Sequence, residues 1–123
     1  MKWIILLAGG GLGTVARYLV SNTISHHYGE RFPYGTLIVN LAGCFLIGFL
    51  ANLSEGKLLL NPTFRLFLII GFLGGFTTFS AFMHETATLI KNGQAMLGLA
   101  NVLASVIAGY VLFYLGIMLA EAL

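Results

Sequence analysis

The sequence predicts an all-α integral membrane protein, a single four-span domain over residues 1–123 whose third helix is interrupted. Three observations support this fold class. The composition is 59% hydrophobic and only 8% charged, the apolar residues form four long segments, and the connections between those segments are short. A water-soluble domain of this size cannot bury so much apolar surface, so lipid must cover the remainder.

Four segments have the length of membrane spans, at about 3–25, 34–53, 62–91 and 95–120. About 20 residues of helix cross a hydrocarbon core, and each helix satisfies its own backbone hydrogen bonds in lipid. The alternation typical of membrane β-strands is absent from the sequence. The first segment carries no small-residue cleavage site, so we expect a retained span rather than a signal peptide.

Glycine is frequent, with 16 residues in the chain, most of them inside the predicted spans. Small residues let helix backbones approach closely in a membrane, where apolar side chains give helices no hydrophobic reason to associate. Together with the short connections, the glycines predict a compact helical bundle.

The third segment carries Gly-Gly-Phe-Thr-Thr at 74–78, near its centre. Each glycine weakens a helix by about 1 kcal/mol relative to alanine, and the hydroxyls of Thr77, Thr78 and Ser80 can cap a new helix. We therefore expect an interruption at 74–78, at mid-depth of the membrane. Unpaired backbone groups are tolerated there only where they line a cavity or bind an ion.

The basic residues that flank the spans are almost evenly divided between the two sides. Lys2, Lys57 and Arg65 fall on one side, and Arg31 and Lys91 fall on the other. Since Lys and Arg in short loops normally set orientation, this balance predicts insertion both ways up and an antiparallel dimer. The basic residues do not cluster, so nucleic acid is not an expected partner.

Asn40 lies in the middle of the otherwise apolar second segment. A buried amide without partners costs several kcal/mol in hydrocarbon, so this side chain must face protein or water. Two interpretations stay open at this point: a hydrogen bond between helices, or a polar group that lines an ion path.

Phe79 and Phe82 lie three residues apart just beyond the interruption, which places them on similar faces of a helix. Packing is the ordinary role of such residues, but Thr78 and Ser80 beside them favour a different one. The edge of an aromatic ring is positive, and the N-terminal end of a helix attracts anions. This segment therefore indicates a path for an anion.

Other polar residues are weaker candidates for such a path. Asn101 and Ser105 share a helical face in the fourth segment, where they either extend a polar track or only pack. Arg17 either reaches the membrane surface along its apolar stem or attracts anions at an entrance. Glu85 and His84 are expected near a pore mouth or at the exposed interface.

No group of residues indicates catalysis, and we expect the chain not to be an enzyme. Ser80, His84 and Glu85 have ordinary helical spacing and no oxyanion loop nearby. The histidines at 26–27 lack further metal ligands, and the single Cys44 lies in an apolar run where we expect a core role.

Three segments carry the most distinctive motifs of the chain: residues 9–18, GGGLGTVARY, residues 35–43, GTLIVNLAG, and residues 71–82, GFLGGFTTFSAF. In this order they resemble the GG--G---RY, GTL-VN--G and GF-GG-TTFS-F segments of the Fluc (CrcB) family of fluoride channels. Ala81 stands where Thr or Ser is frequent in that family. The resemblance covers essentially the whole chain.

The resemblance implies passive export of fluoride across the cell (plasma or inner) membrane, which relieves fluoride toxicity. It implies an antiparallel, dual-topology homodimer with two pores and a structural sodium ion at its centre, held by the backbone carbonyls of Gly74 and Thr77. The implied fluoride path consists of Asn40, Phe79, Phe82 and Ser80, with Arg17 at its vestibule and Thr78, Asn101, Ser105 and Glu85 as weaker candidates.

Two other functions remain as alternatives. A small dual-topology multidrug transporter is also compact and four-spanning, but such proteins generally need a carboxylate in the first span, which this sequence lacks. A non-transporting assembly subunit would explain the glycines but leave the interruption without a purpose. No carboxylate is expected at mid-depth to couple protons, which favours passive export over exchange.

Overall fold

The computed structural model describes residues 1–55 and 61–123, and all regular structure in this part of the chain is helical. Four helical segments are long and apolar enough to cross a membrane, which confirms the predicted four-span fold. The segments η1 and η2 are π-helical and continue directly from the α-helices on either side. In chain order the elements are α1 Lys2–Tyr28, α2 Tyr34–Glu55, α3 Pro62–Arg65, η1 Leu66–Leu73, α4 Gly74–Phe76, α5 Ser80–Lys91, α6 Ala95–Leu103, η2 Ala104–Ala108 and α7 Gly109–Ala122.

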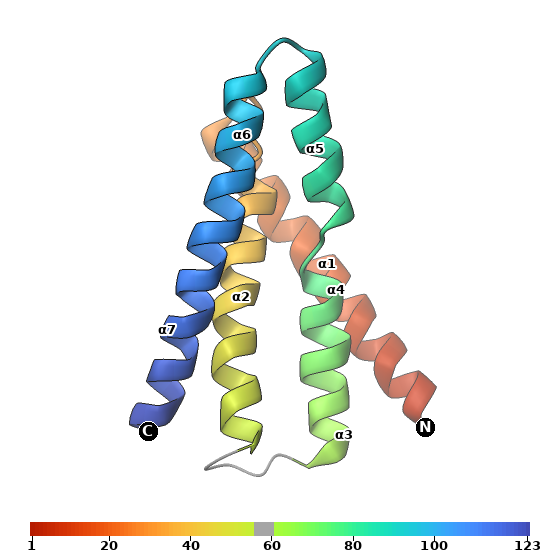
Figure 1. Ribbon diagram of the computed structural model, residues 1–123. Coiled ribbons are helices and arrows are strands. Elements are labelled where there is room, and N and C mark those ends of the chain that lie inside the picture. The colour runs from red at the N-terminus through yellow and green to blue at the C-terminus, as the bar shows by residue number, and fades with distance from the viewer. Residues whose placement is uncertain (56–60) are drawn as a thin grey trace.

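The helices form a bundle that is crossed by α1 (Figure 1). The continuous rod of α6, η2 and α7 packs along α2, while α1 lies obliquely against η1 and α4. Both chain termini lie at one end of the bundle, and the turn between α5 and α6 lies at the other end. The third span belongs to the second of these pairs, and its central residues line a groove between it, α2 and η2.

Local sequence explains where the helices begin and end. Gly29 adopts a positive φ of 85° and its N–H donates to the Ser25 carbonyl, which ends α1 beyond the predicted boundary. The Asn61 side chain accepts from the N–H of Thr63, and Pro62 occupies the first turn of α3.

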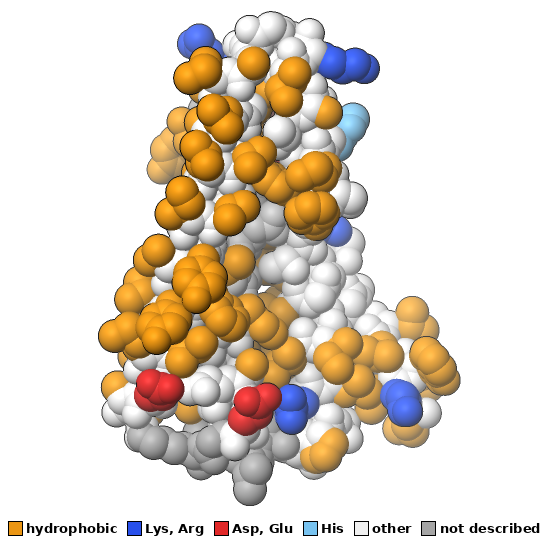
Figure 2. Space-filling view, in the orientation of Figure 1, with side chains coloured by type: hydrophobic (Ala, Val, Ile, Leu, Met, Phe, Trp, Pro, Cys, Tyr) orange, Lys and Arg blue, Asp and Glu red, His pale blue; other side chains and the backbone are white. Residues whose placement is uncertain are grey.

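The face of the bundle in Figure 2 carries apolar side chains along its height, and most of the charged side chains in view lie near the two ends. Trp3 and Leu7, for example, are 74% and 75% exposed. Exposed apolar surface on this scale requires lipid or a partner chain to cover it. The predicted division of basic residues involves Lys57, which lies outside the described residues.

Glycines allow two close helix contacts, as the sequence predicted. A Cβ atom on Gly13 of α1 would collide with the backbone of Phe72 in η1. Across the other contact, a Cβ on Gly116 of α7 would collide with the backbone of Phe45 in α2. The small-residue interpretation is therefore confirmed at these positions.

The two glycines of the central motif are themselves helical, contrary to our expectation for 74–78. Gly74 and Gly75 both belong to α4, and the residues between helices are Thr77 to Phe79. The physical reason is packing: a Cβ on Gly75 would collide with the backbone of Gly10 in α1. A small residue is needed there for a close helix contact, and the chain leaves the helix only at Thr77, which is extended with φ −90° and ψ 156°.

Candidate functional site

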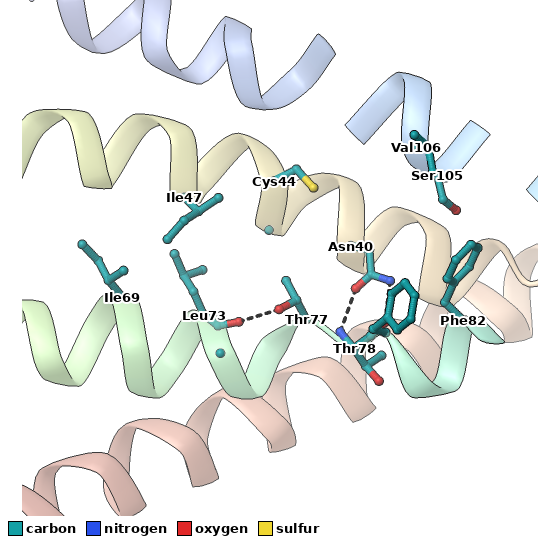
Figure 3. Close-up of a pocket in the computed structure, with 13 residues that line it drawn as sticks. Asn40, Cys44, Ile47, Ile69, Leu73, Thr77, Thr78, Phe82, Ser105 and Val106 are labelled. Carbon is teal, nitrogen blue, oxygen red and sulfur yellow. Dashed lines mark hydrogen bonds between the residues drawn. The ribbon is translucent and has the colours of Figure 1, made fainter. Parts of the chain in front are cut away.

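A groove of about 420 Å³ opens where the third span loses its helical conformation (Figure 3). It lies between α2, the third span and η2, and most of its surface is apolar. None of the described residues that line it is charged. The lining consists of Asn40, Gly43, Cys44, Ile47, Ile69, Leu73, Gly74, Thr77, Thr78, Phe79, Phe82, Ser105 and Val106.

Asn40 holds the backbone of the non-helical segment through both ends of its amide. Its Nδ2 donates to the Thr78 carbonyl at 2.8 Å, and its Oδ1 accepts from the Thr78 N–H at 2.8 Å. These two backbone groups lack helical partners because the chain is extended just before Thr78. The amide therefore replaces the missing helical hydrogen bonds, which is the interhelical role left open for Asn40.

Threonine hydroxyls close the two helix ends that face each other across this segment. Thr77 donates from both its N–H and its Oγ1 to the Leu73 carbonyl, each at 3.0 Å. Thr78 Oγ1 accepts from the N–H of Ala81 at 3.3 Å, as a helix cap does. Among the described residues, no hydrogen bond reaches the carbonyls of Gly74 or Thr77.

Arg17 contacts the end of α4 from the neighbouring helix. Its Nε donates to the Gly75 carbonyl at 3.1 Å, and the side chain is half-buried. We had expected this arginine either to reach the membrane surface or to attract anions at an entrance. The hydrogen bond satisfies a carbonyl at the C-terminal end of a short helix, where a cation is favoured, and the vestibule role of Arg17 stays a prediction.

The two phenylalanines beyond the interruption have very different surroundings. Phe82 is 6% exposed and lines the groove, whereas Phe79 is 72% exposed at its rim. Their ring centroids lie 5.7 Å apart with the planes inclined at 57°. Ser105 lines the groove beside them, and its hydroxyl is buried with no hydrogen-bond partner among the described residues. The groove thus joins a ring pair and an available hydroxyl.

The remaining predicted residues do not line this groove in the described chain. Ser80 is exposed at the start of α5, and Asn101 is buried beside Thr86, to whose Oγ1 it donates at 2.9 Å. Glu85 lines a separate cavity of about 240 Å³. One of its oxygens accepts from Thr36 Oγ1 at 2.7 Å, and its other oxygen is buried without a partner in the described chain.

Sequence reasoning missed Thr36 and Thr86, which hydrogen-bond to Glu85 and Asn101 respectively. A weak signal was present, because each is a hydroxyl on an apolar helix and needs a partner there. Within residues 1–55 and 61–123, no group of three His, Cys, Asp or Glu side chains could hold a metal ion. The oxygens that the groove offers are backbone carbonyls and neutral amide or hydroxyl groups, such as those of Asn40, Thr77 and Ser105.

A comparison with known families matches residues 4–117 to the family described as CrcB-like protein, Camphor Resistance (CrcB). The chain belongs to the CrcB family. A relative from Solibacter usitatus, named fluoride-specific ion channel FluC, is 47% identical over 98% of this chain and 99% of its own length. Relatives of the same name from Rhizobium meliloti and Citrifermentans bemidjiense are 47% and 46% identical, over the whole of this chain and 99% and 98% of theirs.

Membership of the family bears on two of the sequence predictions, the membrane location and the expectation that the chain is not an enzyme. With four spans and relatives named as ion channels, the chain is a multi-pass protein of the plasma membrane. The relatives' name also confirms that this CrcB family member is not an enzyme.

Proposed function

We propose that the chain forms a fluoride-selective channel that exports fluoride passively and so relieves fluoride toxicity. Relatives of nearly the same length, 46–47% identical, carry the name fluoride-specific ion channel. The observation that carries the proposal in this chain is the groove at the interruption. There the buried Ser105 hydroxyl, which has no partner in the described chain, lines the same groove as Phe82 and Asn40.

The groove offers what a small, strongly hydrated anion needs on losing water. Ser105 has a free hydroxyl proton, and Asn40 keeps a second amide proton beyond the one given to Thr78. Ring edges of Phe79 and Phe82 add weakly positive surface. A narrow path with such donors favours fluoride over the larger chloride. None of the described lining residues carries a carboxylate, which favours passive conduction over proton-coupled exchange.

The complete channel in this proposal is an antiparallel homodimer in which the interruption lies at mid-membrane. One side of the groove is open in the single chain, and Phe79 at its rim is 72% exposed. A second copy would cover both. Lys2 and Arg65 lie at one end of the bundle and Arg31 and Lys91 at the other, so the described charges give little preference for one orientation.

A structural sodium ion at the dimer centre completes the proposal. The carbonyls of Gly74 and Thr77 are the candidate ligands, because neither accepts a hydrogen bond from the described residues. Leu73, Gly75 and Thr78 each have carbonyls that accept one. Bare carbonyls in an apolar setting suit a hard monovalent cation, which would add positive potential near the anion path.

The alternatives have less support. A carboxylate in the first span, which a small multidrug transporter generally needs, is absent from α1. A non-transporting subunit would account for the glycine contacts but not for the buried Ser105 hydroxyl.

The deciding experiment is fluoride release from proteoliposomes that contain the purified protein, followed with a fluoride electrode. We expect fluoride release far above that of empty vesicles, with little release of chloride. Fluoride release no faster than from empty vesicles would overturn the proposed function.

A further inference from the structure

Three buried groups form a hydrogen-bonded chain from α6 into α5. Asn101 Nδ2 donates to Thr86 Oγ1 at 2.9 Å, and Thr86 Oγ1 donates to the Phe82 carbonyl at 2.8 Å. Asn101 is 1% exposed, Thr86 7% and Phe82 6%. Among the described residues, no other side-chain hydrogen bond joins α5 to α6. The contact ends on the residue whose ring lines the groove.

α5 needs such a contact because its rotation about its own axis is not fixed by the preceding helix. The residues Thr77 to Phe79 are not helical, so hydrogen bonds of α4 do not continue into α5. Asn40 anchors the backbone at Thr78, and Thr78 Oγ1 caps the first turn of α5. Beyond that turn, the rotation of α5 depends on its own side-chain contacts. Within residues 1–55 and 61–123, the side-chain hydrogen bonds from α5 to neighbouring helices are those of Glu85 and Thr86.

The residues that make these two hydrogen bonds lie on either side of Phe82 around the helix axis. At about 100° per residue, Phe82 lies about 60° from Glu85 and about 40° from Thr86 on the helix wheel, and between them. Glu85 bonds to Thr36 of α2, and Thr86 bonds to Asn101 of α6. Rotation of α5 in either direction would stretch one of the two bonds, and would move the Phe82 ring with the helix.

We propose that Asn101 and Thr86 are positioning residues that fix the rotation of α5 and thereby hold the Phe82 ring at the groove. Asn101 acts through Thr86 and is not itself a lining residue of the described groove. The functional consequence of this contact rests on the proposed fluoride channel. Its structural consequence, the orientation of Phe82, does not.

The first test is a set of fluoride-flux measurements on protein that elutes as a folded assembly. Thr86→Val keeps the shape of the side chain and removes the hydroxyl, whereas Thr86→Ser keeps the hydroxyl. We expect Thr86→Val and Asn101→Leu each to lower flux about tenfold, and the double variant to lower it no further because both remove the same contact. Thr86→Ser should retain flux near that of the unmodified chain.

Thr88→Val is the matched control. Thr88 lies on the same helix and donates to the His84 carbonyl at 2.9 Å, but it is exposed and bonds to no other helix in the described chain. Flux should be unchanged in this variant. An equal loss in Thr88→Val, full flux in Thr86→Val, or losses that multiply in the double variant would each overturn the positioning role.

A second measurement works even if the unmodified chain conducts no fluoride. With Cys44→Ala as background, Phe82→Cys reports the rotation of α5 through its rate of labelling by a water-soluble maleimide. We expect Thr86→Val to change this rate several-fold and Thr88→Val to leave it unchanged. An unchanged rate in Thr86→Val would overturn the positioning role, whereas absent flux in the unmodified chain would overturn only the channel.

Discussion

The side chain of Asn40 pairs with the backbone of Thr78 as one peptide group pairs with another. Both hydrogen bonds measure 2.8 Å, and they satisfy the N–H and the carbonyl of the same residue. In lipid, an unpaired backbone group costs far more than in water, so a non-helical residue inside a span needs such a partner. A single amide on α2 therefore stabilises the non-helical conformation of the third span.

Replacing Asn40 by leucine should destabilise the fold, because both backbone groups of Thr78 lose their partner. The expected cost is about 1–3 kcal/mol for each group left unsatisfied. Unfolding of the purified protein in mixed detergent micelles would measure it. Asn92→Ala, at an exposed position in the α5–α6 turn, should leave stability unchanged. Equal stability of Asn40→Leu and the unmodified chain would contradict the pairing role.

Arg17→Met should weaken the contact between α1 and the end of α4. The variant keeps the apolar stem and removes the charged donor to the Gly75 carbonyl. A hydrogen bond from a charged group typically contributes about 1.5–3 kcal/mol to stability. The same unfolding assay measures the loss. Arg31→Met is the control, since Arg31 is exposed in the connection between α1 and α2. A similar effect of both substitutions would argue against a specific role for Arg17.

How far the sequence predicts the structure depends on what sets each feature. Hydrophobicity alone predicts the four spans, because the bilayer imposes their length. The sequence places the interruption a few residues too early, because glycine predicts a weak point in a helix. In the structure, Gly75 is required by the neighbouring backbone of Gly10, and it is Thr77 that leaves the helix.

The candidate site was predicted only in part, for a related reason. The ring of Phe82 and the hydroxyl of Ser105 were both singled out, and both line the groove. The partners of Asn40 and Asn101 were not predictable, since an apolar span gives almost no periodic signal for which face a polar side chain takes. That choice depends on tertiary hydrogen bonds such as the one between Asn101 and Thr86.

Two glycines of α1, Gly11 and Gly13, should differ in how substitution by alanine changes the stability of the protein. The added methyl of Gly13→Ala would meet the backbone of Phe72, and such overpacking costs about 1–3 kcal/mol. At Gly11 the same methyl meets nothing within 4 Å, so Gly11→Ala should be neutral or slightly stabilising. Thermal unfolding in detergent compares the two. If Gly11→Ala were as damaging as Gly13→Ala, helix contact would not be the reason.

Removal of sodium should weaken the proposed dimer. Without a cation, the carbonyls of Gly74 and Thr77 in the two copies would meet at the dimer centre with neither a hydrogen bond nor a ligand. Unpaired carbonyls in an apolar environment are destabilising. Exchange of sodium for N-methylglucamine, a cation too large for such a site, should increase the monomer fraction measured by dilution in detergent or lipid. A dimer fraction that does not change with sodium would overturn the proposed sodium site. The proposed fluoride path through the groove would not be affected.

Ser105→Ala separates a conducting role from a packing role more sharply than any other substitution in the groove. Its hydroxyl is buried and has no partner among the described residues, so removing it breaks no hydrogen bond within the described chain and relieves a cost of burial. We expect equal or greater resistance to unfolding together with lower fluoride flux, since fluoride would lose a donor on its path. Lower stability with full flux would identify Ser105 as a packing residue whose partner lies elsewhere.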